Sequence, residues 1–132
     1  MAISMNELNP HNNTLTSEQE ANLAILLEKI NKVRTAWAKP MRVNSGLRTM
    51  EEHLAIYAKL GITDQSKIPM KSRHLIGAAV DISDPDGKLY DWVVANESLM
   101  EEIGLWMEVK DAQARVHFQI FPPKSGKRFF NP

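Results

Sequence analysis

The chain has 132 residues, with 16 basic and 16 acidic side chains, a formal net charge of zero and no cysteine. This length fits one domain covering residues 1–132, and the balanced charge argues against a nucleic-acid partner, which would require a positive face. The sequence contains no apolar run near the roughly 20 residues of a membrane span, and any metal ligands must be His, Asp or Glu.

The N-terminal part divides into an arm and a helix. Residues 1–15 are polar, so we expect an irregular arm in which His11 is a solvated loop residue. The start lacks the basic and apolar regions of a secretory signal, which predicts synthesis in the cytoplasm without a signal peptide. Thr16 and Gln19 form a capping-box pattern, and apolar residues then recur at helical spacing until Pro40 ends the helix. We expect this helix to pack the core.

A short strand and a second helix follow. Residues 41–45 are a strand candidate, and residues 46–49 form a turn into a helix over residues 50–60 that is capped by Thr49. Arg48 lies just ahead of this helix, where its side chain can be directed into a cleft. We interpret His53 as a residue on the surface of the helix.

Residues 71–82 hold the candidate metal ligands. His74 and Asp81 lie seven positions apart, and their imidazole and carboxylate groups are ligands that zinc accepts. The apolar run 77–82 predicts a short strand, and the polar loop 61–71 before it can form one wall of a cleft. A pair at this spacing is common by chance, so the spacing alone leaves metal binding open.

The last structured unit is a predicted hairpin, after helical segments at 88–95 and 99–102. Strands over residues 103–109 and 114–120 flank a tight loop, in a register that pairs Trp106 with His117 and Glu108 with Arg115. Side chains alternate faces along a strand. One face therefore collects Trp106, Glu108, Arg115, His117 and Gln119. We expect the basic tail 121–128 to be a loop and assign it no role.

Two segments together resemble a known family. The string Ser72-x-His74-x-x-Gly77-x-Ala79-x-Asp81 matches the S-x-H-x-x-G-x-A-x-D signature of the zinc D-Ala-D-Ala carboxypeptidase and endolysin family, the M15 peptidases. Upstream, the segment 45–49 (SGLRT) is similar to the family's S-G-x-R-[ST] motif. The resemblance covers roughly Val43 to the C-terminus.

The resemblance implies the site residues. It makes His74, Asp81 and His117 the ligands of a zinc ion. Arg48 and Ser72 would hold a carboxylate or carbonyl of the substrate. Family members commonly carry the catalytic acid three positions before the last histidine, where this chain has Ala114. We therefore assign the general acid and base role to Glu108, which shares a strand face with His117, and keep Asp111 as the alternative.

The resemblance also implies fold and function. The expected fold is α+β, a small antiparallel sheet with helices packed to one side, as in zinc DD-peptidases and Hedgehog-like domains. The expected function is that of a zinc metallopeptidase, a hydrolase of peptidoglycan cross-link or stem peptides. We expect a monomeric bacteriophage endolysin, made in the host cytoplasm and active in cell wall degradation. Two alternatives stay open: an inactive zinc-binding module that binds cell wall or a protein partner, and a phage structural component. The cleaved bond, D-Ala-D-Ala or L-Ala-D-Glu, also stays open.

Overall fold

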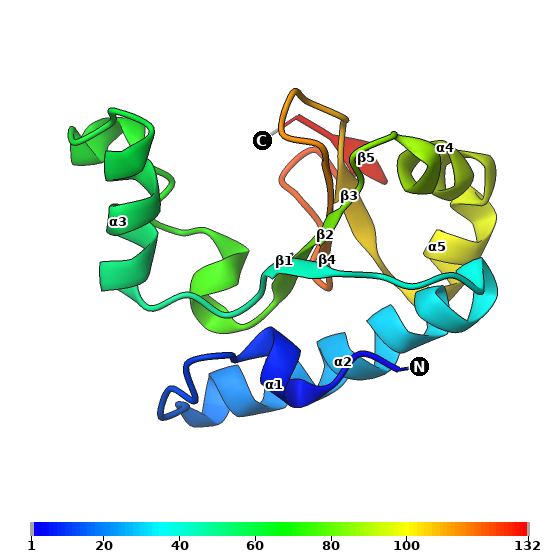
Figure 1. Cartoon of the computed structure of the whole chain (residues 1–132), viewed down its shortest axis with the longest axis horizontal. Coiled ribbons are helices and arrows are strands. Elements are labelled where there is room, and N and C mark those ends of the chain that lie inside the picture. Colours follow the sequence, from blue (N-terminus) through cyan, green and yellow to red (C-terminus); the bar gives the residue numbers. More distant parts are fainter. Residues whose placement is uncertain (1, 132) are drawn as a thin grey trace.

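The computed structural model describes residues 2–131, which form a five-stranded sheet in the order β1-β2-β4-β3-β5 (Figure 1). Neighbouring strands are antiparallel, except that β3 and β5 are parallel. The α+β class with a small, mostly antiparallel sheet is therefore confirmed. The strands are β1 (Val43–Ser45), β2 (Ala79–Ser83), β3 (Trp106–Glu108), β4 (Arg115–Gln119) and β5 (Phe129–Phe130).

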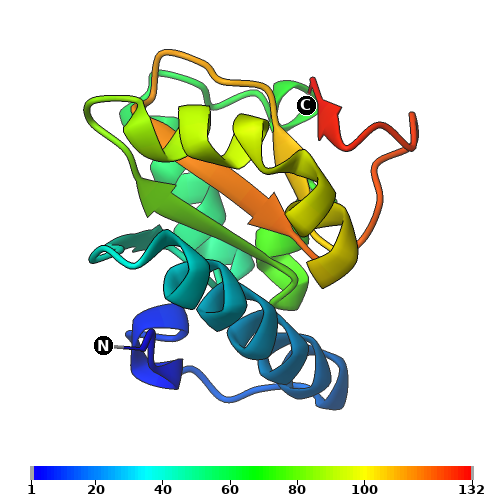
Figure 2. The same cartoon turned by 90° about the vertical axis from the view of Figure 1, so that its right-hand side faces the viewer.

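The helices surround the sheet unevenly. Figures 1 and 2 show α4 and α5 on one side of the sheet and α3 on the other, while α2 runs beneath it. The expected one-sided arrangement thus holds for most helices, and α3 departs from it. The helices are α1 (Met5–Leu8), α2 (Ser17–Trp37), α3 (Met50–Lys59), α4 (Lys88–Ala95) and α5 (Glu97–Ile103), with 3-10 turns η1 (Gln65–Lys67) and η2 (Arg73–Ile76).

Alternation along the strands separates an apolar face from a polar face. Strand residues with odd and even positions point to opposite faces, so β2 buries Val80 and Ile82 on one side and Asp81 on the other. The apolar face packs against α2, α4 and α5, and each fully buried aliphatic side chain there contributes roughly 1.5–3 kcal/mol. The main apolar contributors are Leu23, Leu26, Ile30, Val33, Val80, Ile82, Val93, Met100, Met107, Val116 and Phe118.

The expected caps set the helix starts. The Thr16 side chain accepts a hydrogen bond from the Gln19 backbone, and the Gln19 side chain accepts one from the Thr16 backbone, which completes a capping box. Thr49 caps α3 in the same way with Glu52. These local bonds satisfy backbone N–H groups that a helix start leaves without a partner. Helix α2 ends at Trp37, before Pro40, as predicted.

The N-terminal arm differs from the expectation. Residues Met5–Leu8 form α1, and Leu8 is fully buried, so the prediction of an irregular arm is wrong there; Met1 lies outside the described residues. The Ile3 backbone exchanges two hydrogen bonds with the Asn31 side chain at 2.7 and 3.0 Å, which ties the arm to α2. The Leu8 carbonyl also accepts a 2.8 Å hydrogen bond from the Leu47 backbone. The arm therefore supports the SGLRT segment directly.

The hairpin register also differs. Trp106 pairs with Gln119, whereas the sequence predicted pairing with His117, so the register is wrong by two residues. A shift of two keeps every side chain on its face, because the side-chain period of a strand is two. The connection is longer than expected, and Ala114 within it adopts a left-handed conformation with φ of 53°. Strand β5, which follows the tail 121–128, was not predicted.

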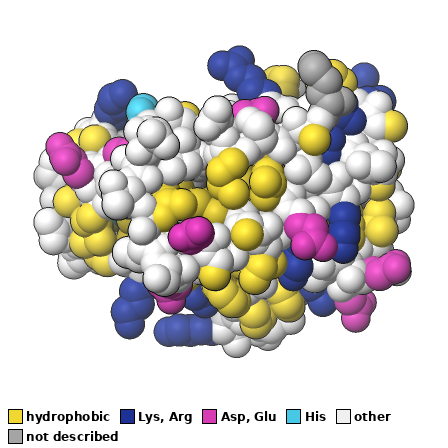
Figure 3. All heavy atoms as spheres, turned by 90° about the horizontal axis from the view of Figure 1, so that it is seen from below, with side chains coloured by type: hydrophobic (Ala, Val, Ile, Leu, Met, Phe, Trp, Pro, Cys, Tyr) yellow, Lys and Arg dark blue, Asp and Glu magenta, His cyan; other side chains and the backbone are white. Residues whose placement is uncertain are grey.

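The underside of the molecule mixes its side-chain types. In the view from below, basic and acidic side chains are interspersed among hydrophobic ones (Figure 3). This arrangement agrees with the balanced composition. Among the described residues, none of the helices has both the length and the apolar character needed to cross a membrane.

A candidate metal centre on the polar face of the sheet

Three buried side chains converge on the polar face of the sheet. One ligand atom each from His74, Asp81 and His117 lies within 4.8 Å of the others. Asp81 and His117 are direct partners across β2 and β4, and His74 reaches them from η2. The sequence predicted these three residues as ligands, and the structure brings them together.

The His74 ring is held by a backbone carbonyl. Its Nδ1 lies 2.8 Å from the Gly46 carbonyl oxygen, to which the Nδ1–H donates, and its Nε2 lies 3.2 Å from Oδ2 of Asp81. Such an outer hydrogen bond fixes the tautomer of a metal-binding histidine and leaves the other nitrogen for the ion. Gly46 must be glycine because an added Cβ would overlap the Leu8 backbone.

The His117 ring is held by Gln119. Its Nδ1 lies 2.8 Å from Oδ1 of Asp81, and its Nε2 donates to Oε1 of Gln119 at 2.8 Å. The Gln119 amide is itself oriented, because its Nε2 donates to the Phe121 carbonyl at 2.8 Å. This chain of bonds keeps a proton on Nε2, so Nδ1 is the nitrogen that would bind a metal ion. We did not predict this role for Gln119, although strand alternation placed it on the correct face.

The charges around Asp81 favour an ionised carboxylate. Burial by itself would raise the pKa of Asp81, but the charge of His74 and hydrogen bonds from His117 and His74 hold that pKa well below its usual range. Burial lowers the pKa of His74, which favours its neutral form. For His117, burial is outweighed by Asp81, and its pKa is raised. Asp81 is thus ready to bind a cation, whereas His117 would release its additional proton when a metal ion binds, because metal ligands must be deprotonated.

Arg48 lies in the wall of the site. Its Nε donates to the Ser45 hydroxyl at 2.9 Å, and its terminal nitrogens lie 3.4 Å from Nδ1 of His53 and from Oδ2 of Asp81. Burial lowers the pKa of Arg48, and the charge of Asp81 opposes that shift. Arg48 thus lines the cleft, and its contact with substrate stays a prediction.

His53 corrects the sequence interpretation. We expected a surface residue, but its side chain is fully buried, with Nε2 at 2.8 Å from the Pro69 carbonyl oxygen. The reason is that loop 61–72 folds back over the inner side of α3. His53 therefore connects that loop to Arg48.

Ser72 has a local structural role. Its side chain caps η2 by accepting a hydrogen bond from the His74 backbone at 3.3 Å. The segment from Ser72 to Ile76 is a turn and not an extended chain. Ser72 nevertheless lines the cleft beside the cluster, and its contact with substrate stays a prediction.

Glu108 lies at the edge of the cluster. Its Oε2 is 3.7 Å from Nε2 of His117, and its Oε1 accepts a 3.1 Å hydrogen bond from Arg115. Asp111, the alternative, lies on the more exposed loop and contacts Arg115 at 3.3 Å. The structure thus places Glu108 closer to the candidate ligands, and its chemical role stays a prediction.

The cluster opens into a cleft of about 800 Å³ between α3 and the polar face of the sheet. A cleft of this size accommodates a short peptide or a comparable ligand. The α3 wall is largely apolar, whereas the floor is charged. Its lining includes Ile56, Tyr57, Leu60, Pro69, Met70, Lys71, Arg73, Lys124 and Phe130, together with the cluster residues.

The fold and the cluster define an α+β domain with a candidate metal site of two histidines and one aspartate. No family model matches the chain, and no curated protein matches it. Among solved structures, the chain is similar to the L-Ala D-Glu endopeptidase ChiX of Serratia marcescens, with a TM-score of 0.54 and 24% identity, over 86% of this chain and 95% of that one. The fold that the family resemblance implied is therefore confirmed.

Proposed function

We propose that this protein is a zinc-dependent peptidase that hydrolyses a bond in the peptides of bacterial peptidoglycan. The observation that carries the proposal is the buried cluster of His74, Asp81 and His117 at the floor of a cleft. The fold shared with an L-Ala D-Glu endopeptidase supports the same reaction. Because of that match, the L-Ala-D-Glu bond is favoured over D-Ala-D-Ala.

The donor set fits zinc. Two imidazole nitrogens and one carboxylate oxygen, each supported by outer hydrogen bonds, are typical of catalytic zinc sites. His74, Asp81 and His117 would hold the ion. When bound, zinc polarises the carbonyl under attack and lowers the pKa of water.

Glu108 is the residue proposed to move protons. A general base needs to reach the attacking water within hydrogen-bond distance, directly or through another water. Glu108 shares the strand face of His117, and Arg115 fixes one of its carboxylate oxygens. The other oxygen would accept the proton of the water and deliver it to the leaving amine.

Arg48 and Ser72 are proposed to orient the peptide. Both line the cleft next to the cluster, and the Arg48 side chain is immobilised by Ser45 and His53. An immobilised guanidinium donates charged hydrogen bonds to a carbonyl or carboxylate with little further loss of freedom. This would place the scissile bond against the ligands.

The biological setting is part of the proposal. We propose a monomeric phage lysis enzyme, made in the host cytoplasm and acting at the cell wall. Support comes from the family motifs and from the activity named for the structural match. A second candidate is a zinc-holding module without activity, which is favoured by one observation, Ala114 at the position where the family commonly carries its acid.

Digestion of purified peptidoglycan tests the proposal. Mass spectrometry of the released fragments should show cleavage between L-Ala and D-Glu, which a chelator abolishes and added zinc restores. The matched control is His117→Ala, which should release nothing. If the zinc-loaded parent releases no fragments, the peptidase proposal is wrong and the non-catalytic module is favoured.

A further inference from the structure

The arginines that line the cleft differ in what they contact. Arg48 uses its Nε and both terminal nitrogens on Ser45, His53 and Asp81. Arg115 is engaged in the same way, because its three nitrogens contact Gln113, Asp81 and two further acids. Those acids are Glu108 at 3.1 Å and Asp111 at 3.3 Å. In both guanidinium groups, every nitrogen therefore already has a contact within the protein.

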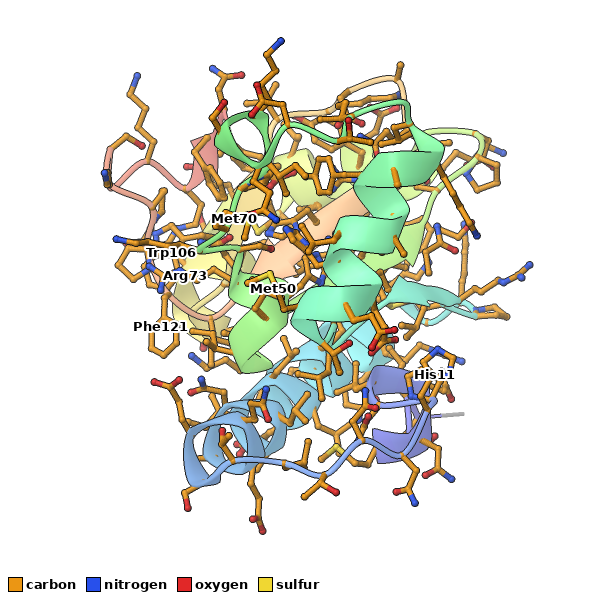
Figure 4. The ribbon with its side chains drawn as sticks, turned by 90° about the vertical axis from the view of Figure 1, so that its left-hand side faces the viewer. His11, Met50, Met70, Arg73, Trp106 and Phe121 are labelled. Carbon is orange, nitrogen blue, oxygen red and sulfur yellow. The ribbon has the colours of Figure 1, made fainter. Side chains whose placement is uncertain are left out.

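Arg73 is the exception. It lies directly before His74 in η2 and lines the same cleft. Within residues 2–131 its side chain makes no hydrogen bond or ion pair with the protein, and its guanidinium lies 5.3 Å from the centre of the Phe121 ring. Figure 4 shows Arg73 and Phe121 together to the left of α3. Stacking on an aromatic ring restrains a guanidinium while its N–H groups stay free to bind an anion.

Two further cations line the cleft that Arg73 lines. Lys71 and Lys124 also line the cleft, from the loop before η2 and from the loop after Phe121. Within residues 2–131, the acids that line the cleft are Asp81, Glu108 and Asp111, and each already contacts Arg115. An uncompensated group of cations in a cleft attracts anionic ligands.

The position of this group relative to the metal ligands follows from β4. Arg115, His117 and Gln119 point to the same face at intervals of roughly 6.8 Å, and Phe121 comes next along the chain. Phe121, with the Arg73 guanidinium 5.3 Å from its ring, therefore lies beyond the Gln119 end, whereas Asp111 contacts Arg115 at the other end and Glu108 contacts both Arg115 and His117. A peptide along the cleft would meet the cations on one side of the ligands only.

We propose that Arg73, stacked on Phe121 and assisted by Lys71 and Lys124, is a specificity site for a free carboxylate of the peptide substrate, close to the cleaved bond. This inference rests on the proposed peptidase function and names its substrate class, an acidic peptide. Arginine binds carboxylates by two parallel hydrogen bonds, which an uncharged amide does not reproduce. Arg48 is then left to hold a carbonyl.

The test compares two peptides that contain the L-Ala–D-Glu bond. In one the glutamate carboxylate outside the peptide chain is free, and in the other it is an amide. We expect the parent to favour the free acid in kcat/KM by roughly tenfold to hundredfold, the range of one charged hydrogen-bonded contact. Arg73→Gln should bring this ratio close to one. The ratio does not depend on the fraction of folded, zinc-loaded protein, so a partly misfolded variant still reports on specificity.

The controls separate this site from general electrostatics. Arg42→Gln makes the same charge change at an exposed residue outside this cleft and should keep the parental ratio. Phe121→Leu removes the ring beneath Arg73 and should lower the ratio in part, through KM. The specificity site is overturned if Arg73→Gln has the same ratio of kcat/KM values as the parent, or if the parent does not prefer the free acid. In either case, hydrolysis of both peptides still supports the peptidase proposal. If neither peptide is cleaved, the peptidase proposal fails, and calorimetric binding of both peptides decides the carboxylate preference separately.

Discussion

Asp81 and His117 face each other directly across β2 and β4, with Oδ1 and Nδ1 only 2.8 Å apart. This register places a carboxylate and an imidazole from distant parts of the chain on one rigid floor. His74 completes the group from a 3-10 turn that is anchored to Gly46. The candidate metal site is therefore preorganised by the sheet and not by a flexible loop.

Removal of one imidazole should remove the metal. We expect His74→Ala and His117→Ala each to lose bound zinc, because two ligands are too few to hold the ion tightly. Elemental analysis after dialysis measures this directly, with His11→Ala as a control at an exposed position outside the cluster. Full zinc content in both variants would refute the ligand assignment.

Gln119→Leu should weaken metal binding without removing a ligand. The substitution leaves Nε2 of His117 without its hydrogen-bond partner, so the proton is no longer fixed on that ring nitrogen. Loss of such an outer hydrogen bond typically costs about 10–100-fold in metal affinity. Competition with a zinc chelator provides the affinity. An unchanged affinity would show that the Gln119 contact does not support the ligand.

Glu108→Ala should retain zinc but lose hydrolysis, since general acid and base catalysis typically contributes about 10²–10⁴-fold. Peptidoglycan turnover and zinc content are measured on the same sample. Asp111→Ala should leave peptidoglycan turnover nearly unchanged, because this side chain lies farther from the cluster on an exposed loop. Parental turnover by the Glu108 variant would place the base elsewhere.

Arg48→Ala should keep zinc and lower kcat/KM by about 10²-fold, which corresponds to a charged hydrogen bond of about 3 kcal/mol. Steady-state kinetics on a soluble peptide provide the value. Arg42→Ala serves as the matched control. If the variant has the same kcat/KM as the parent, Arg48 does not contact the substrate and has only a structural role between Ser45 and Asp81.

His53 should make stability depend on pH. Burial lowers its pKa in the folded state from the ordinary value of 6.5. As the pH falls through 6.5 the unfolded chain therefore binds the proton first, and the contribution of His53 to stability, complete above that pH, is progressively lost. His53→Gln retains a donor for Pro69 and an acceptor for Arg48 but does not titrate.

Urea unfolding at pH 7.5 and 5.5 tests this effect. The free energy of unfolding of the parent should fall more between the two pH values than that of His53→Gln. Because both proteins share the other histidines, the contributions of those residues to the pH dependence cancel in the comparison. Equal losses would mean that His53 titrates identically in the folded and unfolded states.

The sequence by itself determined the elements whose signals are local. Caps at Thr16 and Thr49, helical periodicity and the stop at Pro40 lie within a few residues of what they control, so these boundaries agree with the structure. The ligand pair His74 and Asp81 was likewise readable from one continuous string. Strand alternation was sufficient to place Glu108 and Gln119 on the face of His117.

Only the tertiary structure decided features that depend on distant segments. The β3–β4 register follows the conformation of the connection, including the left-handed Ala114. The predicted register was wrong by two residues, but each side chain was still assigned to the correct face because the side-chain period of a strand is two. His53 is buried because another loop covers its helix, which no helical pattern encodes. Arg73 was one basic residue among sixteen in the sequence. That it has no acidic partner among residues 2–131 appears only when the chain has folded and the other cleft arginines have been paired.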